Sequence, residues 1–92
     1  MLVSRSLRTA EQILGEHLRE LRTSAELSQE ALAEKAGLHR NYVGHLERGE
    51  KNASLHVLLK LSRAFALEPS ELLKCLPLRA VEKMNLDDRE VR

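Results

Sequence analysis

The chain has 92 residues, which fits one domain with a single core, and its hydrophobic residues, 42% of the total, are mostly Leu and Ala. Aromatic residues make up only 2%, which suits a bundle of short helices better than a sheet packed on aromatic rings, so we expect an all-α protein. The net charge of +1 is too small to argue for nucleic acid by itself, one cysteine cannot form an intramolecular disulfide, and no stretch is apolar enough for a membrane span or a secretory signal, so we expect a cytoplasmic protein.

The N-terminal part of the chain predicts an arm followed by a helix. Residues 1–9 lack a clear period and are interpreted as an N-terminal arm. Thr9 and Gln12 have the spacing of a capping box, and apolar residues then recur at helical spacing. These apolar residues are Leu14, Leu18, Leu21 and Ala25. We therefore expect the first helix to run from about residue 10 to residue 25.

The segment from Gln29 to Arg48 predicts a helix-turn-helix. Two short helices, over 29–36 and from after His39 to Arg48, would flank a turn. Ala33 is small where the second helix would press closest, and Gly37 stands where the chain leaves the first helix.

The second helix of this motif carries an unusual outward face. Val43 and Leu46 point inward by helical spacing, which turns four other residues to the opposite side. These are Arg40, Asn41, Gly44 and His45. Arg and Asn side chains bind guanine and adenine in a bidentate manner, and a glycine lets the backbone approach the groove floor. We predict that these four residues face bases in the major groove of double-stranded DNA.

Residues on either side of that helix are predicted to bind phosphate. Ser28 is expected to cap the first helix of the motif, whose N-terminus favours anions, and Gly49 ends the second helix before a polar loop. The predicted phosphate ligands are Ser28, Gln29, Arg48, Lys51 and Asn52. The alternative for Arg48 and Lys51 is that they are simply solvated charges.

Two further helices are expected after this loop. Residues 55–66 are unusually apolar, which predicts a helix with one face in the core and apolar residues left over for another surface. Pro69 suits the first turn of a helix expected over 70–76, and Pro77 ends it. The predicted domain therefore spans residues 10–76, and residues 77–92 form a C-terminal extension.

The surplus leucines of this half predict a homodimer. One helix contacts too few bases to select a site in a genome, whereas a two-fold dimer combines the contacts of two half-sites. We expect Leu72, Leu76 and Leu78 to lie at the dimer interface.

The sequence gives no sign of catalysis or of a cofactor. Its four histidines and Cys75 show no metal-ligand spacing, no Gly-rich phosphate loop is present, and no nucleophile stands beside an obvious base. We expect no metal, no cofactor, no small-molecule effector and no enzymatic activity.

Residues 18–73 resemble the Cro/cI-type helix-turn-helix domain of the Xre family. The matching segments are LRELR, LSQEALAEKAGL, RNYVGHLERG and KNASLHVLLKLSRAFALEPSELL. The resemblance implies a five-helix, lambda-repressor-like fold, base contacts and phosphate contacts from the residues named above, and an internal ion pair between Arg22 and Glu47. The run RNYVGHLERGEKNASL further resembles the controller proteins of restriction-modification systems. The chain departs from the family pattern at His39, where Ser, Thr or Asp is common, and at Gly44, which removes a common base-reading side chain.

Two functions fit these observations. The first is a sequence-specific transcriptional regulator that binds an operator as a dimer. The second is an antitoxin or adaptor that uses the same fold to bind a protein. The outward Arg40 and Asn41 favour the regulator.

Overall fold

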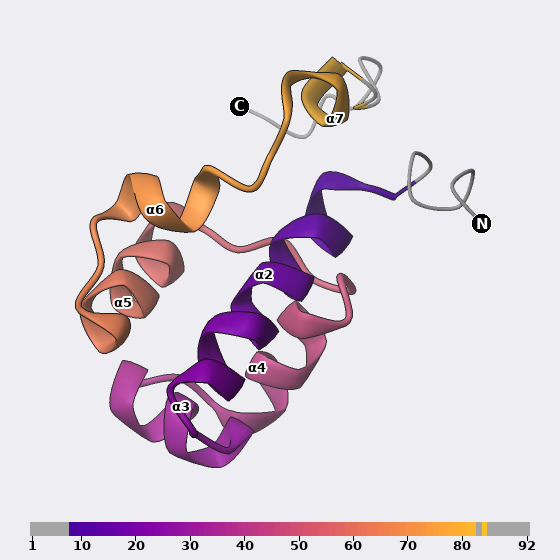
Figure 1. The fold of residues 1–92 in the computed structure, drawn as a ribbon. Coiled ribbons are helices and arrows are strands. Elements are labelled where there is room, and N and C mark those ends of the chain that lie inside the picture. Colours follow the sequence, from indigo (N-terminus) through magenta and orange to yellow (C-terminus); the bar gives the residue numbers. More distant parts are fainter. Residues whose placement is uncertain (1–7, 83, 85–92) are drawn as a thin grey trace.

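The computed structural model describes residues 8–82 and residue 84, and this part of the chain is all-helical, as predicted. Its helices are α2 (Ala10–Ser24), α3 (Gln29–Ala36), α4 (Arg40–Glu47), α5 (Leu55–Phe65), α6 (Pro69–Leu73) and α7 (Leu78–Glu82). Figure 1 shows α2 running through the middle of the molecule, with α5 and α6 to its left, α4 to its right and α3 at its lower end. Most of the predicted arm and the predicted tail, residues 1–7 and 85–92, lie outside the described residues.

The predicted helix starts are held by side-chain caps. Thr9 accepts a hydrogen bond from the backbone N–H of Gln12, and the Gln12 side chain accepts one from the backbone of Thr9, so the predicted capping box is confirmed. Ser28 accepts from the backbone N–H of Ala31 at the start of α3. Gly37, in the left-handed conformation with φ of 72°, then ends α3 as predicted.

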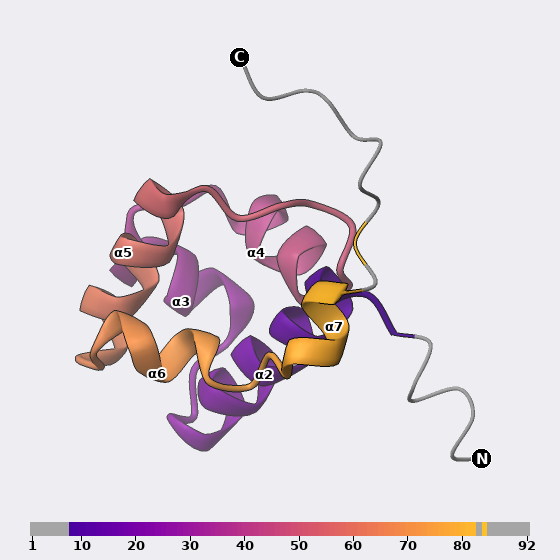
Figure 2. The ribbon, with the colours of Figure 1, turned by 90° about the horizontal axis from the view of Figure 1, so that it is seen from above.

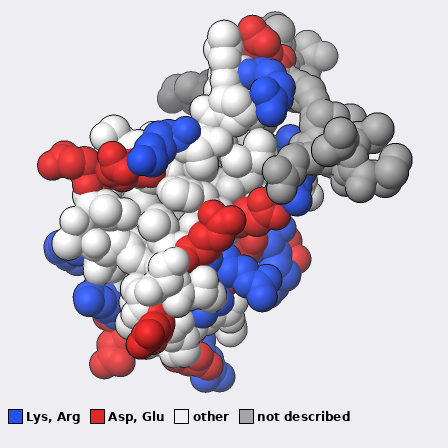
Figure 3. Space-filling view, in the orientation of Figure 1, with Lys and Arg blue, Asp and Glu red and all other residues white. Residues whose placement is uncertain are grey.

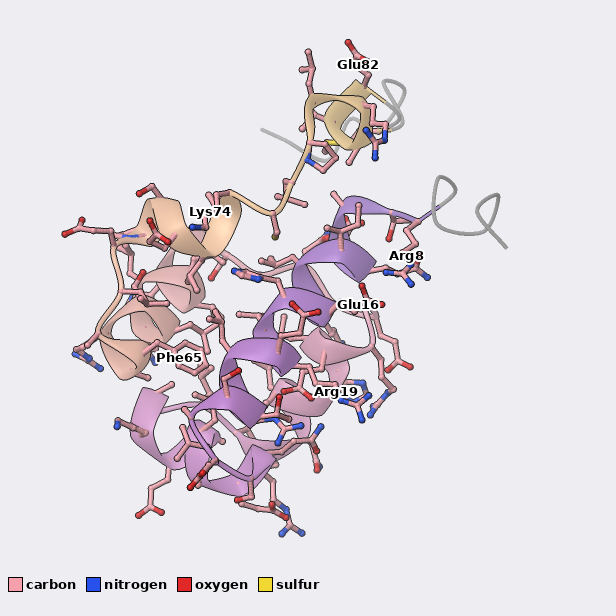
Figure 4. All side chains as sticks on the ribbon, viewed as in Figure 1. Arg8, Glu16, Arg19, Phe65, Lys74 and Glu82 are labelled. Atoms are coloured by element: carbon pink, nitrogen blue, oxygen red, sulfur yellow. The ribbon has the colours of Figure 1, made fainter. Side chains whose placement is uncertain are left out.

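The last two helices differ from the prediction. The helix expected over 70–76 stops at Leu73, and a further helix, α7, follows Pro77. Proline disfavours helical geometry in the residue before it and has no N–H to donate, so a helix cannot run smoothly through this point. Both ribbon views place α7 near the beginning of α2 (Figures 1 and 2). At the beginning of α2, Arg8 forms an ion pair with Glu16, as Figure 4 shows.

The core is formed by small and aliphatic side chains from α2 to α6. Its buried residues are Leu18, Leu32, Ala33, Ala36, Val43, Leu46, Leu61, Ala64 and Leu72. Ala33, Val43 and Leu46 therefore face inward, as their spacing predicts. Ala25, expected on the apolar face of the first helix, is exposed because α2 ends at Ser24 and Ala25 serves as its C-cap.

Gly15 allows α2 to approach the end of α4 closely. A Cβ atom at this position would lie 2.3 Å from the carbonyl oxygen of Leu46 and 2.6 Å from that of Glu47. Both atoms belong to the backbone and cannot move aside, so only glycine fits. This contact fixes the end of α4 against the scaffold.

Candidate nucleic-acid interface

The exposed side of α3 and α4 encloses a polar hollow of about 310 Å³. It is lined by Gln29, Glu30, Arg40, Asn41, Gly44, His45 and Arg48. The structure thus brings together all four residues predicted to face bases and two of the five predicted to bind phosphate. Ser28, Lys51 and Asn52 are exposed outside this hollow.

The start of α4 presents Arg40 and Asn41 to solvent. His39 takes the N-cap position, and its Nδ1 accepts a hydrogen bond from the backbone N–H of Asn41 at 3.2 Å. The imidazole therefore replaces the hydroxyl or carboxylate common in the family. Arg40 lies 3.7 Å from Glu30, but these side chains remain 67% and 63% exposed, so the pair is loose.

Gly44 lines the hollow but is buried. A Cβ there would lie 3.2 Å from Nη1 of Arg48 and 3.5 Å from Oε1 of Gln29, so these two side chains cover it. The expectation that the missing side chain opens the helix backbone to the groove therefore holds only if Arg48 and Gln29 move.

An ion pair beneath this surface holds α4 in place. Arg22 of α2 donates from Nε to Glu47 Oε2 at 2.6 Å and from Nη2 to Oε1 at 3.2 Å, with side chains only 12% and 4% exposed. Arg22 also donates to the carbonyl of Leu27 at 2.8 Å. The hydrogen bond to Glu47 raises the pKa of Arg22 above its ordinary value. The pair therefore joins α2, the loop after it and α4.

The same carboxylate engages Gln29. The Gln29 side chain donates to Glu47 Oε1 at 3.0 Å, so its amide is used inside the protein. The Ser28 hydroxyl is likewise used as the α3 cap. An anion at this end of α3 would therefore meet the backbone N–H groups of the first turn, which have no intrahelical acceptor.

Glu50 is a site residue that sequence reasoning missed. Its Oε1 lies 2.7 Å from Nδ1 of His45, and its Oε2 accepts from Nε of Arg48 at 3.0 Å. These hydrogen bonds, first from Arg48 and then from His45, lower the pKa of the Glu50 carboxyl below its ordinary value. Gly49, with φ of 73°, reverses the chain and brings Glu50 back toward the helix, a contact that no helical spacing indicates.

The loop that follows carries the remaining predicted phosphate ligands. The Tyr42 hydroxyl donates to the backbone carbonyl of Asn52 at 3.0 Å, which ties the loop to α4. Lys51 and Asn52 are both exposed. Both are therefore accessible to a ligand beside α4.

The predicted dimer residues have different environments. Leu72 is completely buried in the core, so its assignment to the dimer interface is wrong, because α6 turns this side chain toward α2 and α5. Leu76 is half-buried, whereas Leu78 is 72% exposed. Leu73, beside Leu72, is also exposed.

Figure 3 shows a broad uncharged area over α5, α6 and the adjoining part of α2, with charged residues around it.

Among residues 8–82 and 84, no three His, Cys, Asp or Glu side chains lie together in an arrangement that could hold a metal ion. None of the described helices combines the length and the apolar character that a bilayer crossing requires.

The fold and this surface define a class of protein, the helix-turn-helix transcriptional regulators. The chain belongs to the helix-turn-helix family HTH_3, whose sequence model matches residues 18–72. The Xre-type resemblance stated from the sequence is therefore confirmed.

Several of the proteins to which this chain is similar are control proteins. The chain is 45% identical over 62 residues to control protein C.SmaI of Serratia marcescens, covering 67% of this chain and 74% of that protein. It is 40% identical over 62 residues to control protein C.BamHI of Bacillus amyloliquefaciens, covering 66% and 76%. Among solved structures, the restriction-modification controller protein C.AhdI from Aeromonas hydrophila is 54% identical with a TM-score of 0.65, covering 66% of this chain and 92% of that chain. The resemblance to restriction-modification controller proteins is thus confirmed.

Proposed function

We propose that this protein is a sequence-specific transcriptional regulator of the control-protein type, which binds an operator as a homodimer with α4 in the major groove. The observation that carries the proposal is the polar hollow of α3 and α4, because it gathers Arg40, Asn41 and His45 on one accessible face of one helix. A short helix with such a face matches the width of the major groove of B-DNA. A DNA ligand also implies a cytoplasmic location.

Arg40 and Asn41 are the best candidates for direct base recognition. Both stand in the first turn of α4, and in helix-turn-helix proteins the N-terminal residues of the recognition helix contact base edges. The loose pairing of Arg40 with Glu30 leaves the guanidinium free to turn toward a guanine, and Asn41 suits an adenine.

Phosphate contacts would flank the recognition helix on both sides. The N-terminus of α3 supplies backbone N–H groups on one side, and Lys51 and Asn52 lie on the other, in a loop held by Tyr42. Arg48 can join them when it leaves Glu50. Such contacts orient the protein and make binding depend on salt.

Dimerisation is supported by the exposed apolar residues of the C-terminal half. Leu73, at the end of α6, and Leu78, at the start of α7, are exposed, and Leu76 in the connection between these helices is half-buried. Together the three leucines give this part of the chain an apolar surface. We place the dimer interface there. Sedimentation in the analytical ultracentrifuge at tens of micromolar should show a dimer, and Leu78→Glu should shift it toward monomer. A wild-type monomer at that concentration would contradict this part of the proposal.

The experiment that tests DNA recognition separates the two kinds of contact. Footprinting on genomic fragments, beginning with DNA upstream of the protein's own gene, would first identify an operator. Arg40→Ala should then weaken operator binding by about 1–3 kcal/mol and leave non-operator DNA nearly unaffected. Lys51→Ala should weaken binding to both DNAs and flatten the salt dependence. Arg63→Ala, which removes an exposed charge on α5, is the matched control and should change neither.

Two outcomes would contradict the proposed function. Equal effects of Arg40→Ala and Lys51→Ala on both DNAs would show that α4 does not recognise bases. Absence of any protected site would favour the protein-binding alternative.

A further inference from the structure

The carboxylate of Glu50 is placed beside two residues of the proposed DNA interface by backbone geometry. The left-handed Gly49 turns the chain, and the backbone N–H of Glu50 then donates to the carbonyl of His45 at 2.9 Å. From this position Oε1 reaches Nδ1 of His45 and Oε2 reaches Nε of Arg48. His45 and Arg48 line the polar hollow, and Glu50, which is itself exposed, contacts both of them without being part of that lining.

These contacts fix which nitrogen of the His45 ring carries the proton. An ionised carboxylate is only an acceptor, and the hydrogen bonds that lower the pKa of Glu50 keep it ionised. A lone pair on Nδ1 would face the lone pairs of Oε1 at 2.7 Å, which is repulsive, so Nδ1 must carry the hydrogen and donate it. The longer approach of Arg48 Nη2 to Nδ1, at 3.3 Å, is then a contact between two donors and not a hydrogen bond.

The other ring nitrogen is then an acceptor. In a neutral imidazole only one nitrogen carries hydrogen, so Nε2 presents a lone pair. In the major groove the donors that match this lone pair are the amino groups of cytosine N4 and adenine N6. Guanine and thymine present acceptors in the corresponding positions, O6 and N7 or O4.

We propose that Glu50 is a positioning residue that sets base specificity: by holding the Nδ1–H of His45, it makes Nε2 an acceptor that selects cytosine or adenine at one position of each half-site. This inference rests on the proposed function, since it requires that α4 faces DNA. Under this proposal Glu50 has two opposite effects on DNA binding. The carboxylate sharpens discrimination at one base pair, and its negative charge weakens attraction to the phosphates of any sequence.

Glu50→Gln tests the inference because glutamine has nearly the same shape. Its amide can accept a hydrogen from Nδ1 or donate one to it, so the ring is no longer held in one form. Binding at pH 8 is measured for operators that carry each of the four bases at each position contacted by α4. The wild type should prefer cytosine or adenine over guanine at one position by about 5- to 100-fold. At that same position both His45→Ala and Glu50→Gln should reduce the preference to less than about threefold. Glu50→Gln should also bind non-operator DNA more tightly.

A spectroscopic measurement tests the tautomer without DNA. Nitrogen-15 chemical shifts of the His45 ring at pH 8 should show hydrogen on Nδ1 in the wild type and a mixture of forms in Glu50→Gln. A wild-type ring with hydrogen on Nε2 would overturn the inference. An unchanged midpoint of thermal unfolding would show that the variant is folded, as expected for an exposed side chain.

The DNA experiment has further outcomes that decide the inference. If Glu50→Gln strengthens binding to all sequences and leaves every base preference unchanged, Glu50 acts only through its charge and the inference is wrong. A preference for guanine that depends on His45 would also overturn it. In both cases the proposed function would still stand if Arg40→Ala weakened operator binding selectively. If the wild type showed no base preference at any position, the proposed function itself would be contradicted.

Discussion

Removal of the Glu47 carboxylate should destabilise the protein more than removal of any exposed carboxylate. Glu47→Ala leaves the Arg22 guanidinium, only 12% exposed, without its bidentate partner, and leaves the Gln29 amide without its acceptor. Breaking a buried ion pair by deleting one partner costs about 3–5 kcal/mol. The Arg22 bond to the Leu27 carbonyl remains, so we expect the lower end, about 3 kcal/mol.

Urea unfolding followed by circular dichroism at 222 nm measures this loss. A domain of this size has an unfolding free energy of about 5–15 kcal/mol, so the variant would lose a large share of it. With a urea dependence of about 1–3 kcal/mol/M, the midpoint should fall by about 1–3 M. Glu30→Ala is the matched control, because its carboxylate pairs loosely with exposed Arg40, and it should cost less than about 1 kcal/mol.

A double variant decides whether charge or shape is responsible. Replacing Arg22 by Met and Glu47 by Leu together leaves no unpaired charge, so most of the lost stability should return. If Glu47→Ala costs no more than Glu30→Ala, the ion pair does not hold α4 in place. If the double variant is as unstable as Glu47→Ala, the loss comes from packing and the electrostatic reasoning fails.

Three further predictions concern the scaffold. Gly15→Ala should lower the free energy of unfolding by about 1–3 kcal/mol, because the new Cβ would meet backbone atoms. Gly44→Ala should raise it by up to about 1 kcal/mol, because its Cβ would meet only the ends of side chains. Equal shifts of the two midpoints of thermal unfolding would contradict this. Leu72→Ala should cost about 2–5 kcal/mol and the exposed Leu55→Ala little, as urea unfolding can show. Burial raises the pKa of the Cys75 thiol, so iodoacetamide at pH 8 should alkylate it more slowly than free cysteine until urea unfolds the chain.

Local patterns were enough to predict much of the fold. The caps at Thr9 and Ser28 and the left-handed turn at Gly37 depend on residues within four positions of each other, so the sequence alone indicates them. The inward spacing of Val43 and Leu46 also determines which face of α4 is outward. The sequence could therefore predict which residues of α4 face the polar hollow, although it could not predict the hollow itself.

Contacts between distant or irregular segments were not predictable in this way. Gly15 is an ordinary helix residue in the sequence, and its role appears only where α2 meets the carbonyls of α4. Leu72 and Leu73 are neighbours of the same type, and only the packing of α6 decides that the first is buried and the second exposed. Glu50 reaches His45 because a non-helical turn intervenes, which no helical period describes.

Carboxylates paired with the arginines of the proposed DNA interface explain how a chain with a net charge of only +1 can bind DNA. Arg40 faces Glu30 and Arg48 faces Glu50, so each acidic group offsets part of the attraction of its partner to phosphate. Base edges carry no net charge, so hydrogen bonds to them are weakened less than phosphate contacts. The protein should therefore depend more on base contacts than a strongly basic regulator does.

The salt dependence of operator binding tests this argument. With Lys51 as the main phosphate-binding cation and Arg48 partly neutralised, each protomer would release about one to two counterions, giving a slope of log K against log salt of about −1 to −2 per protomer. Glu50→Gln frees Arg48 and should steepen the slope by about 1 per protomer, whereas Glu71→Gln, whose carboxylate pairs with Lys74 on α6, should leave it unchanged. A wild-type slope near −10 for the dimer, or an equal response to both substitutions, would mean that phosphate contacts dominate and that these carboxylates do not moderate them.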